Sequence, residues 1–235
     1  MTIDVSIEGR AAALRIENLD TDQIMPKQFL RGIDKSGLRD GLLHDLRFDP
    51  QGTARSDFVL NRADYHDASI LIGGANFGCG SSREHAVWGL QQFGIRAIVA
   101  SSYAEIFYSN AMNNRLLLVT LAPELVARLM DDADDPSGNA IQIDIGAQTL
   151  RSRSMQASFD LMPRHRTMFL EGLDSIGLSL TYQHEISAFA RDHWGRQPWL
   201  REVGAVGTKA ARDDSGPGSN AAWRREGREQ RRSLG

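Results

Sequence analysis

Short apolar runs alternate with stretches of helical spacing through the middle of the chain. The runs at residues 69–73, 96–100 and 116–120 have the length and composition of buried strands. Residues 84–93 and 103–114 repeat apolar side chains at helical spacing, and Gly94 marks the end of the first helix. Strand, helix and strand in succession predict βαβ units with parallel pairing.

Weaker patterns flank this core. Alternation predicts a first strand at residues 12–17, a hairpin at 141–145 and 148–151, and an edge strand at 157–159. Helical spacing predicts helices at 123–130, 163–171 and 182–194. Inward-facing side chains are expected at Ile106, Phe107 and Met112 in the middle of the chain, and at Ile186, Phe189 and Ala190 in the last helix.

A glycine-rich turn joins the first buried strand to its helix. Gly78 and Gly80 permit positive φ and close approach of the backbone. Ser81, Ser82 and Arg83 follow at the start of the helix, where unpaired N–H groups and the helix dipole favour negative charge. An arginine fork binds a carboxylate through two hydrogen bonds, and a hydroxyl can move a proton. This pattern indicates a site for an anionic substrate.

Other interpretations of this turn exist. Ser81 or Ser82 followed by Glu84 also has the form of a helix N-cap with a capping box. The turn lacks the Gly-x-Ser-x-Gly elbow of a triad hydrolase, and no Gly-Lys-Ser/Thr follows it as in a phosphate-binding loop. The local pattern leaves a substrate site and a capped helix open.

Ordered motifs extend well beyond this turn. They are Asp-Thr-Asp-Gln-Ile-Met-Pro at residues 20–26, Phe-Gly-Cys-Gly-Ser-Ser-Arg-Glu-His-Ala at 77–86, Phe-Gly-Ile-Arg-Ala at 93–97, Ala-Glu-Ile-Phe-Tyr-Ser-Asn at 104–110 and Gly-Leu-Asp-Ser-Ile-Gly-Leu at 172–178. Together they resemble the small, swivelling domain of the aconitase superfamily, and specifically the small subunits of bacterial isopropylmalate isomerase. The resemblance covers residues 14–190.

The resemblance implies an α/β fold, a swivelling β/β/α domain whose mixed, partly parallel central sheet is flanked by helices. It implies a hydro-lyase that isomerises a small dicarboxylic hydroxy acid by removing and restoring water, in leucine biosynthesis. Ser81 is then the catalytic base, Ser82, Arg83 and Arg31 bind substrate, and Asp22 and Gly80 support them.

Cysteine content bears on the cofactor that the resemblance implies. Cys79 is the single cysteine, and a [4Fe-4S] cluster takes three or four thiolates. We therefore expect no cofactor on this chain. The cluster is expected on a separate large subunit, with which this chain forms a heterodimer or a higher assembly.

Charge and hydropathy exclude some partners and compartments. The formal net charge of −3 gives no field for nucleic acid. No apolar run reaches the roughly 18 residues that cross a membrane, and the first residues lack the pattern of a signal peptide. We expect a soluble, cytoplasmic protein. Residues 1–200 are expected to form one domain, and residues 201–235, with eight Lys or Arg against five Asp or Glu, a disordered basic tail.

Two acidic groups are candidate metal ligands. Asp20 and Asp22 flank a threonine, but a lone Asp-Thr-Asp more often forms a turn that binds its own backbone. The aspartates of residues 131–135 lack the spacing of an EF-hand, which favours a solvated turn.

The sequence leaves the substrate open. Val87 and Ser102 stand where the family usually has proline, and residues 115–118 and 162–166 also depart from its pattern. A related hydro-lyase, such as homoaconitase, citraconate/methylmalate hydratase or dimethylmaleate hydratase, remains an alternative. So does a non-catalytic binding module.

Overall fold

The computed structural model describes residues 6–30 and 37–200. Arg31 and the predicted disordered tail lie outside the described residues. The chain divides into two compact units, residues 1–179 and 180–235. The first contains the sheet and the glycine-rich turn. The boundary expected at residue 200 stays a prediction.

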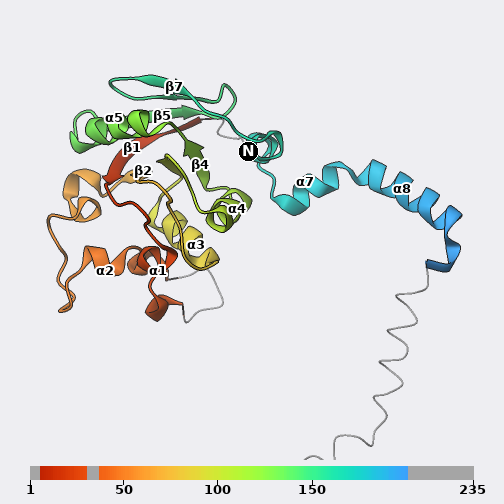
Figure 1. Ribbon diagram of the computed structural model, residues 1–235, viewed down its shortest axis with the longest axis horizontal. Coiled ribbons are helices and arrows are strands. Elements are labelled where there is room, and N and C mark those ends of the chain that lie inside the picture. Colours follow the sequence, from red (N-terminus) through yellow and green to blue (C-terminus); the bar gives the residue numbers. More distant parts are fainter. Residues whose placement is uncertain (1–5, 31–36, 201–235) are drawn as a thin grey trace, which may run out of the picture. The chain divides into compact units, whose positions relative to one another are not determined.

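A seven-stranded mixed sheet forms the centre of the first unit (Figure 1). Its spatial order is β4-β3-β2-β1-β5-β6-β7. The first four strands pair in parallel, and β5, β6 and β7 continue the sheet in antiparallel pairing. The α/β fold with a partly parallel sheet is confirmed. The strands are β1 (Ser6–Leu14), β2 (Ala68–Gly73), β3 (Ala97–Ala100), β4 (Leu117–Thr120), β5 (Ala140–Asp144), β6 (Thr149–Arg151) and β7 (Gln156–Ser158).

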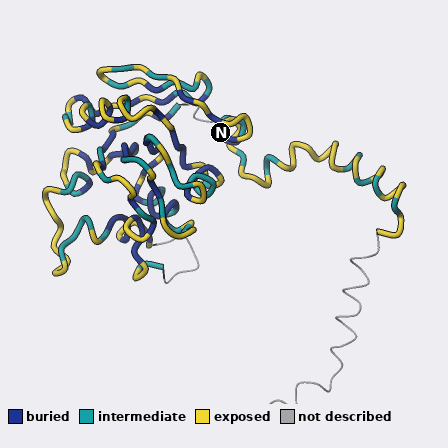
Figure 2. Tube along the Cα trace, viewed as in Figure 1, coloured by how far each residue is buried: buried dark blue, intermediate teal, exposed yellow. Residues whose placement is uncertain are grey.

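Helices cover both faces of the parallel strands. α3 and α4 pack together on one side, and α5 packs against β1, β2 and β3 from the other (Figure 1). β2, β3 and β4 are almost wholly buried between these layers, whereas β1 is buried mainly in its second half (Figure 2). The helices of this unit and the boundary are α1 (Thr21–Ile24), α2 (His44–Arg47), α3 (Glu84–Phe93), α4 (Glu105–Asn113), α5 (Pro123–Asp134), α6 (Pro163–Glu171) and α7 (Ser175–Thr181), with 3-10 turns η1 (Lys27–Phe29), η2 (Arg39–Gly41), η3 (Val59–Asn61) and η4 (Ala63–Tyr65).

The structure corrects several predicted boundaries. β1 begins at Ser6 rather than at residue 12, because residues 6–10 pair with β5, and Gly9 leaves room there for Ser69 of β2. α5 extends through Asp134 instead of ending at residue 130. Phe107 and Met112 are buried as predicted, but the prediction for Ile106 is wrong, because its side chain is 53% exposed.

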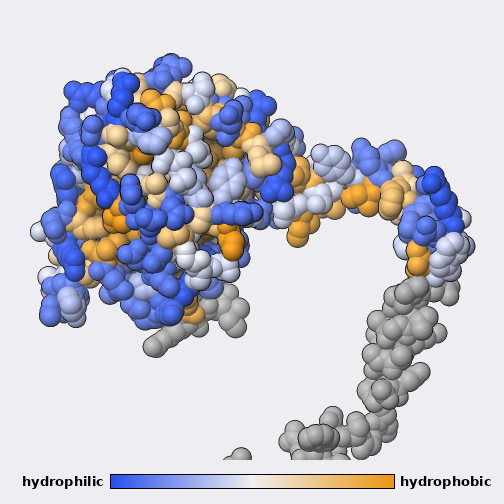
Figure 3. All heavy atoms as spheres, in the orientation of Figure 1, coloured by the Kyte–Doolittle hydropathy of each residue, from blue (hydrophilic) through white to orange (hydrophobic). Residues whose placement is uncertain are grey.

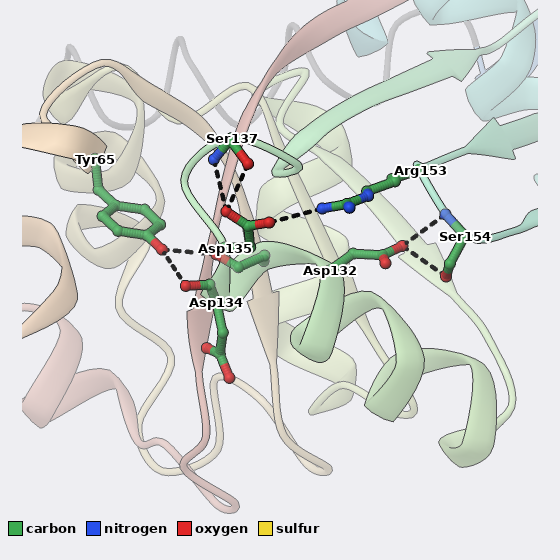
Figure 4. A network of polar contacts seen from close by, with 8 residues as sticks. Tyr65, Asp132, Asp134, Asp135, Ser137, Arg153 and Ser154 are labelled. Atoms are coloured by element: carbon green, nitrogen blue, oxygen red, sulfur yellow. Dashed lines mark hydrogen bonds and ion pairs between the residues drawn. The ribbon is translucent and has the colours of Figure 1, made fainter.

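The acidic run after residue 130 is only partly the predicted turn, because Asp131, Asp132 and Asp134 lie at the end of α5 and the turn begins at Asp135. Figure 4 shows the carboxylates of Asp132 and Asp135 hydrogen-bonded to neighbouring residues of the protein. Asp132 accepts hydrogen bonds from the hydroxyls of Ser152 (2.6 Å) and Ser154 (2.8 Å), and Asp135 accepts one from Arg153 (2.6 Å). Burial acts to raise the pKa of Asp132, but these hydrogen bonds outweigh it and the pKa is lowered. The aspartates therefore tie α5 to the β6–β7 turn.

The second unit contains the helix α8 (Gln183–Arg196) and the turn η5 (Pro198–Leu200). The predicted helix is confirmed, but the prediction that Ile186 and Phe189 face inward is wrong, because they are 49% and 69% exposed. α8 packs against η5, which is too short to cover its apolar side. Figure 3 shows hydrophobic residues at the surface of the segment with α7 and α8. Within the described residues, no helix is both long and apolar enough to cross a membrane.

His165 on α6 is one of few buried polar side chains, and it is 1% exposed. Its Nε2 accepts a hydrogen bond from Nε of Arg164 (3.0 Å), so the neutral ring carries its proton on Nδ1. Nδ1 has no hydrogen-bond partner among the described residues. Burial, and after it the charge of Arg164, lowers the pKa of His165 below 6.5. The fold therefore favours the neutral ring.

This shift predicts a dependence of stability on pH. The unfolded chain takes up a proton at His165 near pH 6.5, before the folded chain does, so the free energy of unfolding falls as pH drops below 6.5. His165→Gln removes the titrating ring, and we expect a flatter curve between pH 7.5 and 5 in urea unfolding. Equal slopes for the two proteins would contradict the assignment. Asp132 does not contribute to the change in stability between pH 7.5 and 5, because its pKa lies below 3.8.

Candidate active site

Two loops from neighbouring parallel strands form the site. β1 and β2 pair in parallel, and Leu14 lies opposite Gly73 at their ends. The chain therefore leaves both strands at the same edge of the sheet, where α/β proteins commonly bind ligands. The loops that follow, residues 15–20 and 74–83, consequently lie beside each other from the point where they leave the strands.

Backbone hydrogen bonds join these two loops along their length. The N–H of Asn18 donates to the carbonyl of Ala75 (2.9 Å), the N–H of Gly78 to Leu19 (2.8 Å), and the N–H of Thr21 to Cys79 (2.8 Å). A third loop, after β3, adds a further pair of bonds, because Phe77 donates to Ser102 and accepts from Ala104 (3.1 Å each). The glycine-rich turn is held from two sides.

Both glycines of the turn are required by the backbone. Gly78 has φ +77° and Gly80 has φ +92°, values that side chains disfavour. A Cβ on Gly78 would also collide with the ring of Phe107, whereas one on Gly80 would touch only Asp20 and Thr21, at 3.4 and 3.5 Å. Gly80 thus supports the turn by its conformation, and Gly78 by both conformation and space.

The two candidate serines of the turn are accessible and do not cap the helix. Ser81 and Ser82 are exposed. The N-cap of α3 is Arg83, and no side chain makes a cap hydrogen bond there, so the capping-box interpretation of the serines is wrong. The capping box lies instead in the other loop, where Asp20 accepts from the N–H of Gln23 (2.7 Å).

Arg83 lies against the second acidic residue of that other loop. Its guanidinium forms an ion pair with Asp22, and the arginine side chain is 16% exposed while the aspartate is 50% exposed. The nitrogen that faces Asp22 is Nη1, which is buried and has no hydrogen-bond partner within the described residues. Asp22 therefore holds the guanidinium in place through Nη1, and a further carboxylate would have to meet the other N–H donors of the fork.

The residues just after the arginine are engaged elsewhere. Glu84 accepts a hydrogen bond from the side-chain amide of Asn114 (2.6 Å), which also accepts from the indole of Trp88 (3.0 Å). The ring of His85 packs on Trp88, with centroids 4.8 Å apart. These contacts anchor the start of α3 and engage both the Glu84 carboxylate and the His85 ring.

Sequence reasoning overlooked Thr21. This residue is 1% exposed, and its hydroxyl donates to the backbone carbonyl of Ser81 (2.8 Å) and lies 3.4 Å from the Ser81 hydroxyl. Its position in the Asp-Thr-Asp motif was the available signal. The motif alone does not indicate that Thr21 contacts Ser81.

The chain offers no ligand set for an iron–sulfur cluster among residues 6–30 and 37–200. No group of three His, Cys, Asp or Glu side chains there could hold a metal ion. Cys79 is half-buried, and its thiol donates to the carbonyl of Asn18 (3.2 Å). These residues do not fit such a cluster.

Comparison with known proteins decides the family. The chain is 58% identical over 206 residues to the 3-isopropylmalate dehydratase small subunit 1 of Chromobacterium violaceum, covering 88% of this chain and 97% of that protein. The chain belongs to the family of 3-isopropylmalate dehydratase small subunits. The Aconitase C-terminal domain profile matches residues 1–124. The small subunit of Caulobacter vibrioides is 47% identical over 195 residues, which cover 83% of this chain and 96% of that one.

A solved structure of a 3-isopropylmalate dehydratase has a similar fold. It is the crystal structure of 3-isopropylmalate dehydratase (leuD) from Methanocaldococcus jannaschii, with a TM-score of 0.58 and 26% identity. The alignment covers 78% of this chain and 98% of that one. The swivelling-domain fold expected from the sequence is confirmed.

The two glycines predict different costs of substitution. We expect Gly80→Ala to lower the free energy of unfolding by about 1–2 kcal/mol, the cost of a left-handed residue. Gly78→Ala should cost more, because the ring of Phe107 must also move. Urea unfolding of both variants measures the difference. An equal or smaller loss in Gly78→Ala would contradict the packing described at this turn.

Proposed function

We propose that this chain is the small subunit of a 3-isopropylmalate dehydratase that interconverts 2-isopropylmalate and 3-isopropylmalate through isopropylmaleate, in leucine biosynthesis. The observation that carries the proposal is an exposed Ser81 beside Arg83, on a turn fixed by hydrogen bonds to a second loop. Membership of the small-subunit family supports it.

The reaction sets a task that these residues suit. A proton must leave a carbon adjacent to a carboxylate, and we assign Ser81 as the base that takes it. Arg83 binds a substrate carboxylate through its fork, and Ser82 adds a hydroxyl to the same anion. Asp22 keeps the fork oriented, so the substrate does not have to order it.

The partner completes the site. We propose that a large subunit carries the [4Fe-4S] cluster and pairs with this chain in a heterodimer or higher assembly. Such a cluster supplies a Lewis acid for departure of the hydroxyl. The exposed edge with Ser81 and Ser82 is the part of this chain that would face the shared site.

Ser81→Ala tests the base. The chain co-expressed with its large subunit should lose turnover by about 10²-fold or more, because general base catalysis contributes on that order. The heterodimer should still form. Ultraviolet absorbance of the unsaturated intermediate reports turnover, and sedimentation reports assembly. The unmixed chain, free of iron, serves as the inactive control. Wild-type turnover in Ser81→Ala would remove Ser81 from this role, and activity of the unmixed chain would refute a shared site.

Arg83→Lys tests carboxylate binding. Lysine keeps the charge but not the two parallel hydrogen bonds, so we expect KM to rise about tenfold, the loss of one charged hydrogen bond. The smaller change in kcat separates binding from chemistry. An unchanged KM would contradict the contact. Homologous hydroxy diacids, assayed with the wild-type pair, determine whether isopropylmalate is the preferred substrate.

A further inference from the structure

Thr21 places its hydroxyl next to the proposed base from a segment 60 residues away in the sequence. We propose that Thr21 is a positioning residue for Ser81, holding its backbone and supplying a hydrogen-bond donor to the serine oxygen when that oxygen is negatively charged. This inference rests on the proposed function. It adds a residue to the reaction that neither the sequence pattern nor the family comparison assigns.

The Thr21 side chain is fixed more firmly than the serine it touches. It is 1% exposed, and its β-branched side chain has few rotamers. Its N–H donates to Cys79 (2.8 Å) and its carbonyl accepts from Met25 (3.0 Å). The capped turn of α1 begins at this residue. Oγ1 therefore occupies one defined place under the exposed serine.

Two distances from Oγ1 of Thr21 indicate which acceptor its single hydroxyl proton faces. Oγ1 of Thr21 is 2.8 Å from the carbonyl oxygen of Ser81 and 3.4 Å from its Oγ. A carbonyl only accepts, so the threonine proton points to it, and the Ser81 hydroxyl can only donate to Thr21. The 3.4 Å contact is long, as catalytic hydrogen bonds often are before substrate binds.

Loss of the Ser81 proton changes this arrangement. The alkoxide is an acceptor with a full charge, and a rotation about the Cβ–Oγ1 bond of Thr21 turns its proton from the carbonyl to the alkoxide. The carbonyl keeps a second donor, because the N–H of Arg83 also binds it (2.8 Å). The Thr21 proton can therefore turn away without leaving this part-buried carbonyl unpaired. This hydrogen bond stabilises the charged form of Ser81.

The other titratable and charged groups near Ser81 each contact another group of the protein, and they are the same in the wild type and in the Thr21 variants. Asp20 binds the N–H of Gln23, Asp22 binds Arg83, and Glu84 binds Asn114. The thiol of Cys79 donates to Asn18, and His85 packs on Trp88. A substitution that removes only the Thr21 hydroxyl leaves each of these contacts unaltered.

Thr21→Val and Thr21→Ser form a matched pair for the test, in the complex with the large subunit. Valine keeps the shape and removes the hydroxyl, and serine keeps the hydroxyl. For Thr21→Val we expect kcat to fall about tenfold or more with little change in KM, as for one charged hydrogen bond. The ascending limb of kcat against pH should move to higher pH. Thr21→Ser should restore both.

A readout without activity accompanies the kinetics. Amide hydrogen exchange of residues 78–83 should rise in Thr21→Val and not in Thr21→Ser, because the tie to Ser81 is lost. Faster exchange without any movement of the pH profile would reduce Thr21 to a purely structural contact and overturn the donor role. Equal impairment of both variants would also overturn it, because the hydroxyl would not be the cause.

Ser81→Ala separates this inference from the function on which it rests. If Ser81→Ala is inactive and Thr21→Val behaves as wild type, the inference on Thr21 fails and the proposed function stands. If Ser81→Ala retains turnover, both fail. If the wild-type pair prefers another hydroxy diacid, the proposed substrate fails, and the variants are compared with that diacid instead.

Discussion

Parallel pairing of β1 with β2 is the constraint on which the site depends. It brings two loops, distant in the sequence, out of the sheet at the same edge and at the same height. Three backbone hydrogen bonds then join the loops, and Gly74 permits the approach, since a Cβ there would collide with the carbonyl of Ile16. The serine turn is consequently a rigid part of the sheet edge rather than a free loop.

The proposed chemistry is distributed between the two loops. The glycine-rich turn carries the serines and the arginine, and the Asp-Thr-Asp loop carries groups that contact them. Asp22 holds Arg83, and Thr21 holds Ser81. Ser81 and Arg83 thus each have a neighbour from the other loop. Under the proposed function, a substrate meets these two side chains already placed, which lowers the entropic cost of the reaction.

Much of the fold follows from local sequence, and the site does so only in part. The helix 84–93 and its end at Gly94 were predicted to the residue, because spacing and a glycine with φ +118° act locally. The cap was misplaced, because α3 begins only at Glu84 with Arg83 as its N-cap, and the two serines lie before that position. The contact of Thr21 with Ser81 depends on strand pairing, which a motif 60 residues away does not encode. The inward face assigned to α8 was wrong because spacing identifies an apolar side but not what covers it.

The hydrogen bonds between the two loops also determine when the serine turn gains its support during folding. Each of their hydrogen bonds closes a long stretch of chain, which is entropically costly and slow. The βαβ segment from β2 to β3 is more local, and it can form before β1 is in place. A partly folded chain would then present the serine turn without its supporting loop. The contact between Thr21 and Ser81 therefore forms only when β1 is inserted in the sheet.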